Sequence, residues 1–315
     1  MQKRHKQQAL PRGTLVSHYR IDKPIGGGGF SIVYLAFDEK NGDNVAIKEF
    51  LPSTEAERGE NGLVEPISDD NATAYRQGIK RFFDEAATLA KVNHSNIVRV
   101  INVFRANNTV YMVMRHEIGK DLRWYIKRKD GRLGENVIRT IFPPLLLGLR
   151  EVHNTKLLHL DIKPANIFLR PGGNPLLLDF GAARNAVVDI RQAGPHTLTP
   201  GFAPIEQHLG GHVGPWSDLY AIGATMWSCI AGHAPPPSTA RREKDTYKPA
   251  VREFGREYSR QLLEAIDWCL QFHQLERPQS VQALLDFLNP LRAGETVNDD
   301  EGLLARFGLR LPWSE

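Results

Sequence analysis

The hydrophobic pattern changes character once along the chain, and this change limits the folds that the chain can adopt. Between residues 19 and 115, five segments rich in valine, isoleucine, tyrosine and phenylalanine are separated by glycine, asparagine and aspartate turns, which predicts strands at residues 19–26, 31–38, 44–50, 96–106 and 109–115. The exception is residues 79–92, "IKRFFDEAATLAKV", whose apolar residues recur at helical spacing. Long helical patterns follow Gly119. We therefore predict a small β-rich lobe and a larger helical lobe joined near residues 115–119, with a ligand site between them.

The clearest pattern in the helical part covers residues 137–154. It contains Pro143 and Pro144, which predict a kink or an unusual helix start, because proline lacks the backbone N–H that an interior helical position donates. Three further helical segments are predicted at residues 218–232, 260–272 and 280–290.

The composition argues against several classes of protein. Among 315 residues, 40 are basic and 36 acidic and both signs are spread along the chain, so the net charge of +4 does not indicate a nucleic-acid surface. No apolar run approaches the roughly 20 residues needed to span a bilayer, and no signal peptide is visible. The two cysteines, Cys229 and Cys269, lie in apolar helical contexts and are predicted to be buried free thiols. We therefore expect a cytoplasmic protein without a membrane span.

Three segments leave alternatives open. Residues 1–18 form a basic leader, predicted to be flexible and solvated, with attachment to an anionic surface as the alternative. Residues 51–77 are predicted to be a long insertion, which is either a tolerated surface loop with a short hairpin near residues 63–67 or a regulatory or docking element. The tail, residues 291–315, could pack on the helical lobe, inhibit it, or bind a partner. The sequence does not indicate an oligomeric state or an activating signal.

The stretch "IGGGGFSIVY" places Gly26, Gly28 and Gly29 in a turn between two predicted strands. Glycines let backbone N–H groups approach phosphates closely, although a glycine-rich hairpin gives the same pattern. In "VAIKEF", Lys48 is either exposed on its strand or able to reach a phosphate. A lysine held for that purpose needs a carboxylate, and Glu85, in the middle of the predicted helix, is the candidate.

The stretch "LLHLDIKPANIFL" places three polar residues between apolar runs. Asp161 could accept a proton from a hydroxyl nucleophile, Lys163 could stabilise a phosphoryl group, and Asn166 offers an amide oxygen to a metal. Asp179, in "LLLDFG", follows thirteen residues after Asn166. Carboxylate and amide oxygens are the ligands that Mg²⁺ selects. Their joint occurrence predicts a site for phosphoryl transfer.

The order of these motifs, followed by "TPGFAPIEQ", resembles the eukaryotic-like (Hanks-type) serine/threonine protein kinases, notably their bacterial members, over about residues 19–288. The resemblance implies an α+β, bilobal protein-kinase-like fold, with a small antiparallel β-sheet N-lobe that carries one main helix and a larger, mainly α-helical C-lobe. The expected bounds are 19–114 for the N-lobe and 115–290 for the hinge and C-lobe. The implied activity is transfer of the ATP γ-phosphoryl group to serine and threonine hydroxyls of protein substrates, with ATP and Mg²⁺ required.

The resemblance also implies roles for individual residues. The expected catalytic residues are Asp161 as the base, Lys163, Lys48 and Glu85. The residues expected to bind ATP are Gly26, Gly28, Gly29, Val33, Ala46, Lys48, Met114, Arg115, Glu117, Asp121, Asn166 and Asp179. Of these, Asn166 and Asp179 are expected to bind the metal.

Further positions match the part of the family that supports protein substrates. Thr199 matches the substrate-loop threonine, Glu206 and Arg277 match an internal brace, and Asp218 matches the aspartate that anchors the catalytic loop. His159 is expected to brace that loop rather than to take part in catalysis. Members of the bacterial branch are often encoded beside a dephosphorylating protein, so a cognate protein phosphatase is an expected partner.

Two departures from the family pattern narrow the prediction. Ser31 replaces the third glycine of the glycine-rich loop, and Leu160 stands where many members carry arginine. That arginine pairs with a phosphate on the activation loop, and leucine has no donor with which to do so. We therefore expect activity that does not depend on such phosphorylation, unless Arg184 or Arg191 substitutes. The alternatives are a pseudokinase that acts as a scaffold or nucleotide sensor, and an ATP-dependent transferase that acts on a small molecule.

Overall fold

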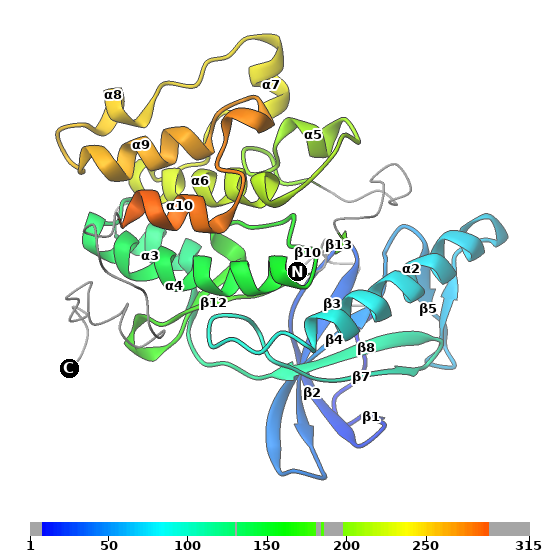
Figure 1. Ribbon diagram of the computed structural model, residues 1–315. Helices are drawn as coiled ribbons and strands as arrows, with labels where there is room; N and C mark the ends of the chain where they lie inside the picture. The colour runs from blue at the N-terminus through cyan, green and yellow to red at the C-terminus, as the bar shows by residue number, and fades with distance from the viewer. Residues whose placement is uncertain (1–7, 130, 181–183, 186–197, 290–315) are drawn as a thin grey trace. The chain divides into compact units, whose positions relative to one another are not determined.

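The computed structural model describes residues 8–129, 131–180, 184–185 (backbone only) and 198–289 (Figure 1). The described chain divides into two compact units. The first contains residues up to Asn93 together with Val98–Glu117, and the second contains His94–Ile97 and the residues from Ile118 onward.

The first unit is built on a six-stranded sheet in which every pair of neighbouring strands is antiparallel. In spatial order the strands are β1 (Leu15–Val16), β2 (Tyr19–Gly28), β3 (Ser31–Asp38), β4 (Asp43–Phe50), β8 (Thr109–Arg115) and β7 (Val100–Ala106). Four of the five predicted strand segments coincide with strands to within two residues. The fifth, predicted from residue 96, begins at Val100.

A single long helix, α2 (Asp69–Leu89), packs on this sheet. Its Phe82 ring lies 5.4 Å, between centroids, from the Phe50 ring of β4. Gly78 lets the helix approach, because a Cβ there would come within 2.6 Å of the same ring. The prediction of a helix over residues 79–92 is therefore wrong at its start, since α2 begins ten residues earlier.

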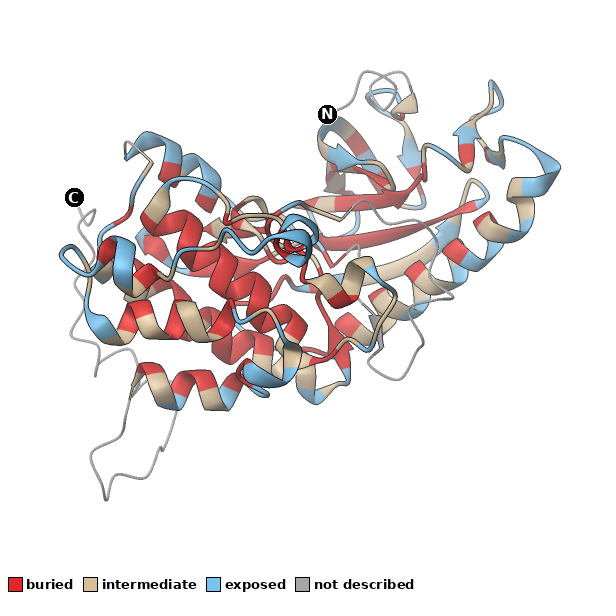
Figure 2. Ribbon diagram, turned by 90° about the horizontal axis from the view of Figure 1, so that it is seen from above, coloured by how far each residue is buried: buried red, intermediate tan, exposed pale blue. Residues whose placement is uncertain are grey.

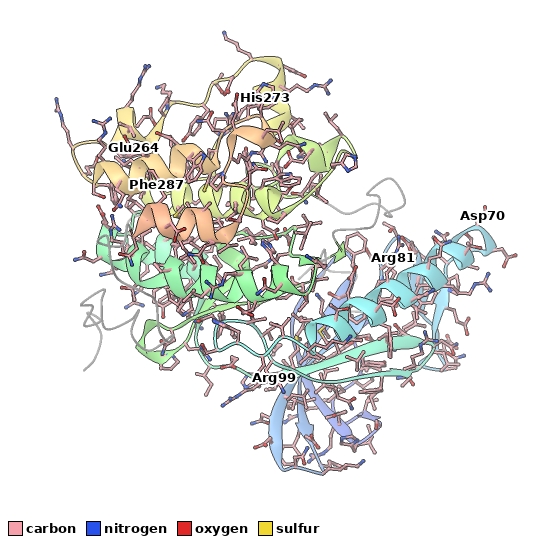
Figure 3. All side chains as sticks on the ribbon, viewed as in Figure 1. Asp70, Arg81, Arg99, Glu264, His273 and Phe287 are labelled. Carbon is pink, nitrogen blue, oxygen red and sulfur yellow. The ribbon has the colours of Figure 1, made fainter. Side chains whose placement is uncertain are left out.

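The first turns of α2 explain why the sequence pattern missed them. They carry Asp69 and Asp70, whose negative charges are favoured at the positive end of the helix dipole, and Figure 3 labels Asp70 at this end of the helix. The polar stretch that follows them shows little apolar periodicity. Tyr75 is buried there and stacks on Phe50, with 5.9 Å between ring centroids. Packing on the sheet, rather than sequence periodicity, therefore accounts for this end of the helix.

The predicted insertion at residues 51–77 contains a hairpin, as expected, although the hairpin is longer than predicted and consists of β5 (Ala56–Arg58) and β6 (Val64–Pro66). The rest of the segment is not a loop, because it forms the first half of α2. Arg58 of this hairpin forms a buried ion pair with Glu49 of β4, with 2.5 Å between Nη2 and Oε2. The Glu49 side chain is fully buried and also accepts hydrogen bonds from the hydroxyls of Tyr34 (2.7 Å) and Tyr111 (2.5 Å). The insertion is thus an integral part of the sheet unit.

The leader makes specific contacts in the part that the structure describes, which starts at Gln8. Leu10 is buried, and its N–H donates to the Tyr34 hydroxyl at 3.1 Å. The backbone carbonyl of Gln8 accepts a hydrogen bond from Arg58 Nε at 3.0 Å. Packing against the hairpin and pairing of β1 with β2 therefore hold residues 8–18, whereas the basic run of the leader lies outside the described residues.

The second unit is mainly helical. Its helices are α3 (Leu122–Arg128), α4 (Glu135–Asn154), α5 (Ile205–His208), α6 (Pro215–Ala231), α7 (Ser238–Glu243), α8 (Ala250–Phe254), α9 (Arg260–Cys269) and α10 (Val281–Leu288). Short strands form two small sheets, one of β12 (Pro175–Leu177), β11 (Ile167–Leu169) and β9 (Lys120–Asp121), the other of β10 (Leu157–Leu158) and β13 (Arg184–Asn185). Figure 2 shows buried residues on most turns of the central helices. α6 is buried from Ser217 to Ile230, as expected for a core helix.

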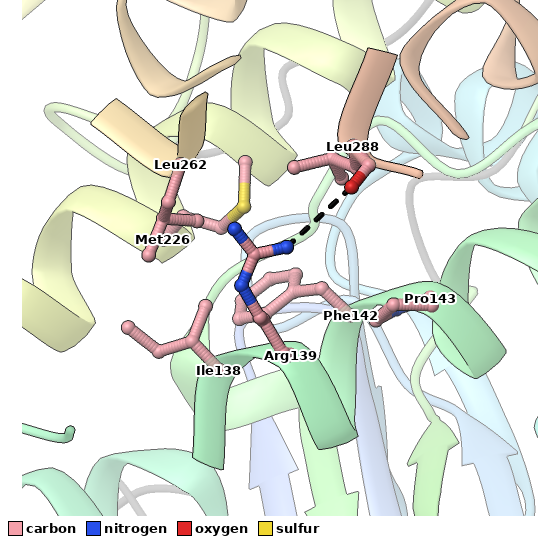
Figure 4. Close-up of a pocket in the computed structure, with 7 residues that line it drawn as sticks. All are labelled: Ile138, Arg139, Phe142, Pro143, Met226, Leu262 and Leu288. Atoms are coloured by element: carbon pink, nitrogen blue, oxygen red, sulfur yellow. Dashed lines mark hydrogen bonds between the residues drawn. The ribbon is translucent and has the colours of Figure 1, made fainter. Parts of the chain in front are cut away.

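α4 contains both prolines in its interior, so neither marks an unusual start. Side chains of α4 line a small cavity together with residues of three other helices (Figure 4). Arg139 extends across it from α4 and donates to the carbonyl of Leu288 at the end of α10. A basic side chain thus bonds a carbonyl at the C-terminal end of a helix, where the helix dipole favours positive charge.

The two cysteines are buried and free, as predicted. Burial raises the pKa of the Cys229 and Cys269 thiols, so both stay protonated near neutral pH. No helix within the described ranges is both long and apolar enough to cross a membrane.

The buried ion pair leads to a test of stability. Arg58→Met should lower the free energy of unfolding by about 3–5 kcal/mol, because it leaves the Glu49 charge buried without a cation. Chemical denaturation followed by tryptophan fluorescence measures this. Arg20→Met provides the control, because the Arg20–Glu39 pair (2.9 Å) is exposed, and such a pair contributes less than about 1 kcal/mol. Equal effects of the two substitutions would contradict the importance of the buried pair.

Candidate active site

Four polar residues of the second unit form a closed hydrogen-bonded cluster. Lys163 Nζ lies 2.8 Å from each carboxylate oxygen of Asp161 and donates to Thr199 Oγ1 at 3.0 Å. Thr199 Oγ1 in turn donates to Asp161 Oδ1 at 3.1 Å. The amide nitrogen of Asn166 donates to the backbone carbonyl (2.8 Å) and to Oδ2 (3.0 Å) of Asp161. The cluster fixes the Asp161 carboxylate as an acceptor beside a cationic side chain.

The loop that carries this cluster is anchored by Asp218 of α6, a fully buried aspartate. Asp218 Oδ2 accepts the N–H of His159 (2.9 Å), and Oδ1 accepts the N–H of Leu160 (2.8 Å). Burial raises the pKa of the Asp218 carboxyl, but the hydrogen bond from His153 and those from the backbone outweigh it and lower the pKa. The prediction of a loop-anchoring aspartate is confirmed.

His159 is a brace within the loop, as predicted. It is fully buried, and its ring packs against the Phe180 ring in a tilted arrangement, with 4.4 Å between centroids. Nε2 lies 2.9 Å from the carbonyl of Leu178, and Nδ1 lies 3.2 Å from the backbone N of Asp161. Because a carbonyl only accepts and an N–H only donates, the proton is on Nε2 and the ring is neutral. Burial lowers the pKa of His159, which favours this neutral form.

Asn166, a member of this cluster, and Asp179, thirteen residues further along the chain, both carry hard oxygen donors. Asn166 uses its amide nitrogen on Asp161, so its amide oxygen is the atom left for a cation. Its backbone carbonyl accepts the N–H of Leu178, which ties the segment leading to Asp179 to the loop. Asp179 has an exposed side chain and a left-handed backbone, with φ of 61°. One carboxylate and one amide oxygen fit Mg²⁺, which usually keeps several waters or phosphate oxygens as further ligands.

In the first unit, the strand register gathers several of the predicted ATP-binding residues on one face of the sheet. Lys48 of β4 pairs with Val33 of the neighbouring strand β3 and with Met112 of the other neighbour, β8. Ala46 of β4 pairs with Met114 of β8. Because directly paired residues and alternate residues of a strand share a face, Val33, Ala46, Lys48 and Met114 lie on the same side. The Lys48 side chain is buried.

Phe50 lies on this same face, two residues after Lys48, and α2 packs against it. Glu85 follows Phe82 by three residues on α2, so both lie on similar sides of the helix. The predicted pairing of Lys48 with Glu85 remains a prediction.

The glycine-rich segment forms the turn between β2 and β3. Gly26 and Gly28 end β2 and Gly29 follows, and no atom would lie within 4 Å of a Cβ added to Gly28 or Gly29. Gly27, which the sequence prediction left out, is the position where a side chain is excluded, because a Cβ there would lie 2.8 Å from the carbonyl oxygen of Ser31. Ser31 pairs with Gly28 at the start of β3. The hairpin geometry therefore requires a glycine that the phosphate-loop pattern did not single out.

The remaining predicted ligand residues lie close in sequence to the point where the chain passes from the first unit to the second, between Glu117 and Ile118. Arg115 and Glu117 belong to the first unit, with 3.9 Å between Arg115 Nε and Glu117 Oε1. Asp121 belongs to the second, where Oδ1 accepts the N–H of Trp124 at 2.8 Å and caps α3. Its Oδ2 lies 3.1 Å from Arg123. The sequence did not predict this capping role.

The predicted brace of Glu206 and Arg277 is confirmed. Arg277 Nη1 lies 2.7 Å from Glu206 Oε1, and both side chains are buried. Ser217 donates to the same oxygen at 2.8 Å, and the Arg277 guanidinium lies 4.7 Å from the centre of the Tyr220 ring. The brace fixes α5 against α6.

Arg191 lies outside the described residues, as does Thr197. Arg184 is described only through its backbone in β13.

The comparisons with known proteins agree on one family. A model described as "Protein kinase domain" matches residues 19–287. The serine/threonine-protein kinase PknA of Nostoc sp. is 29% identical over 284 residues, which cover 87% of this chain and 47% of PknA. The CBL-interacting serine/threonine-protein kinase 12 of Arabidopsis thaliana is 32% identical over 235 residues, 73% of this chain and 44% of that protein. The chain thus spans about half the length of these curated relatives.

Among solved structures, the apo form of PpkA-294 matches with a TM-score of 0.79 and 33% sequence identity. The match covers 90% of this chain and 100% of that one. It confirms the predicted α+β fold class, with an antiparallel-sheet part and a mainly helical part.

The neutral, buried His159 leads to a prediction on pH. Below its ordinary value of 6.5, the unfolded imidazole gains a proton that the folded one, with its lowered pKa, does not. The free energy of unfolding should therefore decrease as pH falls below about 6.5, by up to about 1.4 kcal/mol per pH unit from this group. Denaturation between pH 7 and 5.5 should show a shallower decrease in His159→Gln than in the wild type.

His212→Gln is the matched control, because the His212 side chain is exposed. It should keep the wild-type pH dependence. An unchanged slope in His159→Gln would contradict the neutral brace.

Proposed function

Because this chain belongs to the protein kinase domain family, we propose that it is a serine/threonine protein kinase that transfers the γ-phosphoryl group of ATP to hydroxyl groups of protein substrates. The observation that carries the proposal is the cluster of Asp161, Lys163, Thr199 and Asn166, in which every donor is directed at one carboxylate. The residues of this cluster can orient a substrate hydroxyl and stabilise negative charge, and these are the two contributions that phosphoryl transfer requires of a protein.

In this proposal Asp161 orients the attacking hydroxyl and accepts its proton. Lys163, 2.8 Å from both carboxylate oxygens, stabilises the negative charge of the phosphoryl group during transfer. Thr199 bonds both residues and places the substrate loop beside the base. Catalysis then comes mainly from positioning and electrostatic stabilisation.

ATP binding is assigned to residues of both units. In the sheet unit, Gly26, Gly28 and Gly29 would contact the phosphates through backbone N–H groups, and Lys48, paired with Glu85, through its ammonium group. The shared face of Val33, Ala46 and Met114 supports a role in contacting the adenine ring. The backbone of residues 115–117 would bind the adenine edge. Asp121 would bind the ribose through Oδ2, since Oδ1 caps α3.

Asn166 and Asp179 would hold Mg²⁺ through their side-chain oxygens. When bound, the ion neutralises charge on the phosphates of ATP. The use of the Asn166 amide nitrogen by Asp161 supports this role, because it turns the amide oxygen away from the base.

Leu160 supports activity without phosphorylation of the activation loop. Its side chain is buried and apolar and offers no donor to a phosphate. The segment that carries Asp161 is instead held by hydrogen bonds that its backbone N–H groups donate to Asp218 and His159, and these bonds need no modification. We further expect a cytoplasmic location and a cognate protein phosphatase as a partner.

The base assignment is tested with Asp161→Asn, labelled γ-phosphate ATP, Mg²⁺ and a generic protein substrate. Phosphoserine or phosphothreonine formation should fall at least about 100-fold, because the amide cannot accept the proton. Asp286→Asn, at an exposed aspartate of the same unit, is the control and should retain activity. Nucleotide binding without transfer by the wild type would support the pseudokinase alternative. Transfer only to a small molecule would support the other alternative, and equal transfer by both variants would contradict the role of Asp161.

Independence from activation-loop phosphorylation is tested with Thr197→Ala. The variant should keep most of the wild-type kcat, because Leu160 cannot bind a phosphate placed on Thr197. Steady-state kinetics with a protein substrate measure this. A variant that folds and binds ATP yet transfers no phosphate would refute the prediction.

A further inference from the structure

The peptide group between Leu160 and Asp161 is held at both ends by side chains. Its carbonyl, on Leu160, accepts a hydrogen bond from Gln207 Nε2 at 3.0 Å. Its N–H, on Asp161, donates to His159 Nδ1 at 3.2 Å. A carbonyl oxygen only accepts, so the Gln207 amide must present its NH₂ group there. The orientation of this peptide group determines the position from which the Asp161 side chain extends.

The backbone at Leu160 needs such support, because it is in a conformation that residues with a Cβ disfavour. Its φ is 59°, in the left-handed region, and its side chain is buried. Asp218 holds the N–H of Leu160 at 2.8 Å, and Gln207 holds its carbonyl. Both polar groups of this residue are therefore fixed by side chains from other segments.

Gln207 is itself mounted on an anchored element. It lies on α5, directly after Glu206, whose carboxylate is paired with Arg277 at 2.7 Å and with the Ser217 hydroxyl at 2.8 Å. These partners are buried, so α5 is fixed against α6. The Gln207 amide thus connects a rigid brace to the residue next to the base.

We propose that Gln207 is a positioning residue that holds the Leu160–Asp161 peptide group, and through it the Asp161 carboxylate, in the orientation needed for phosphoryl transfer. The inference rests on the proposed kinase function. A neutral amide here supplies the order that an arginine paired with a phosphate would supply elsewhere, since Leu160 cannot form that pair. Gln207 acts through the backbone of Leu160 and does not touch the reacting groups.

The test compares the wild type with Gln207→Met, which keeps the side-chain length and removes the donor. We expect kcat for a protein substrate to fall about ten-fold, the size of effect that losing one neutral hydrogen bond produces, with KM for ATP little changed. Amide hydrogen exchange of peptides covering residues 157–163 should become faster, whereas peptides from α6 and α9 should be unchanged. The exchange measurement does not depend on activity.

Gln271→Met is the matched control. The amide of Gln271 also donates to a backbone carbonyl, that of Asp267 at 3.1 Å, and its side chain is exposed. It should leave both kcat and exchange of residues 157–163 unchanged. If Gln207→Met does not fold, Gln207→Asn, which keeps the amide on a shorter side chain, is measured in its place with the same expected result.

The outcomes separate this inference from the proposed function. Wild-type kcat and unchanged exchange in a folded Gln207 variant would overturn the positioning role and leave the kinase function intact. Faster exchange in a protein whose wild type transfers no phosphate would overturn the kinase function while keeping the structural link. A fall in kcat accompanied by the same fall in Gln271→Met would also overturn the inference, because the effect would not be specific to the loop.

Discussion

The buried carboxylate of Asp218 is the constraint on which the arrangement of the second unit depends. It accepts two successive backbone N–H groups and the ring of His153, and these bonds lower its pKa although burial opposes them. A charge kept inside a protein needs such partners. Because its partners are backbone groups of the loop, satisfying the charge also fixes the loop. The positions of His159, Leu160 and then Asp161 follow from this one requirement.

The first unit contains a comparable device on the sheet face opposite Lys48. Alternate residues of β4 face opposite sides, so Lys48 points to one and Glu49 to the other, where Arg58 neutralises it. The hairpin inserted after β4 is therefore tied to the strand that carries Lys48. Removing residues 58–71 would remove Arg58 and leave a buried charge uncompensated. The insertion cannot be treated as a disposable loop.

Residue types and the order of the motifs along the sequence were enough to predict the candidate functional residues. They were not enough to predict the contacts between segments that are far apart in the sequence. The loop brace of His159, the anchor Asp218 and the pair Glu206–Arg277 were predicted from the family resemblance and are confirmed. The start of α2 was missed because its first turns are polar and depend on packing against Phe50. Likewise, nothing in the pattern joins Gln207 to Leu160, 47 positions away, because a glutamine on a short helix is ordinarily a solvated residue.

Leu160 gives these observations a common consequence for control. A link between an arginine and a phosphate can be made and removed by enzymes, whereas the hydrogen bonds that join this loop to Asp218, His159 and Gln207 are formed by the fold itself. Under the proposed function, a catalytic loop held in this way has no local step at which phosphorylation could switch its order. Regulation would then act on another requirement of the proposed reaction, either on ATP binding or on access of the protein substrate to Asp161. The way the loop is held and the proposed location of control thus both follow from leucine standing at position 160.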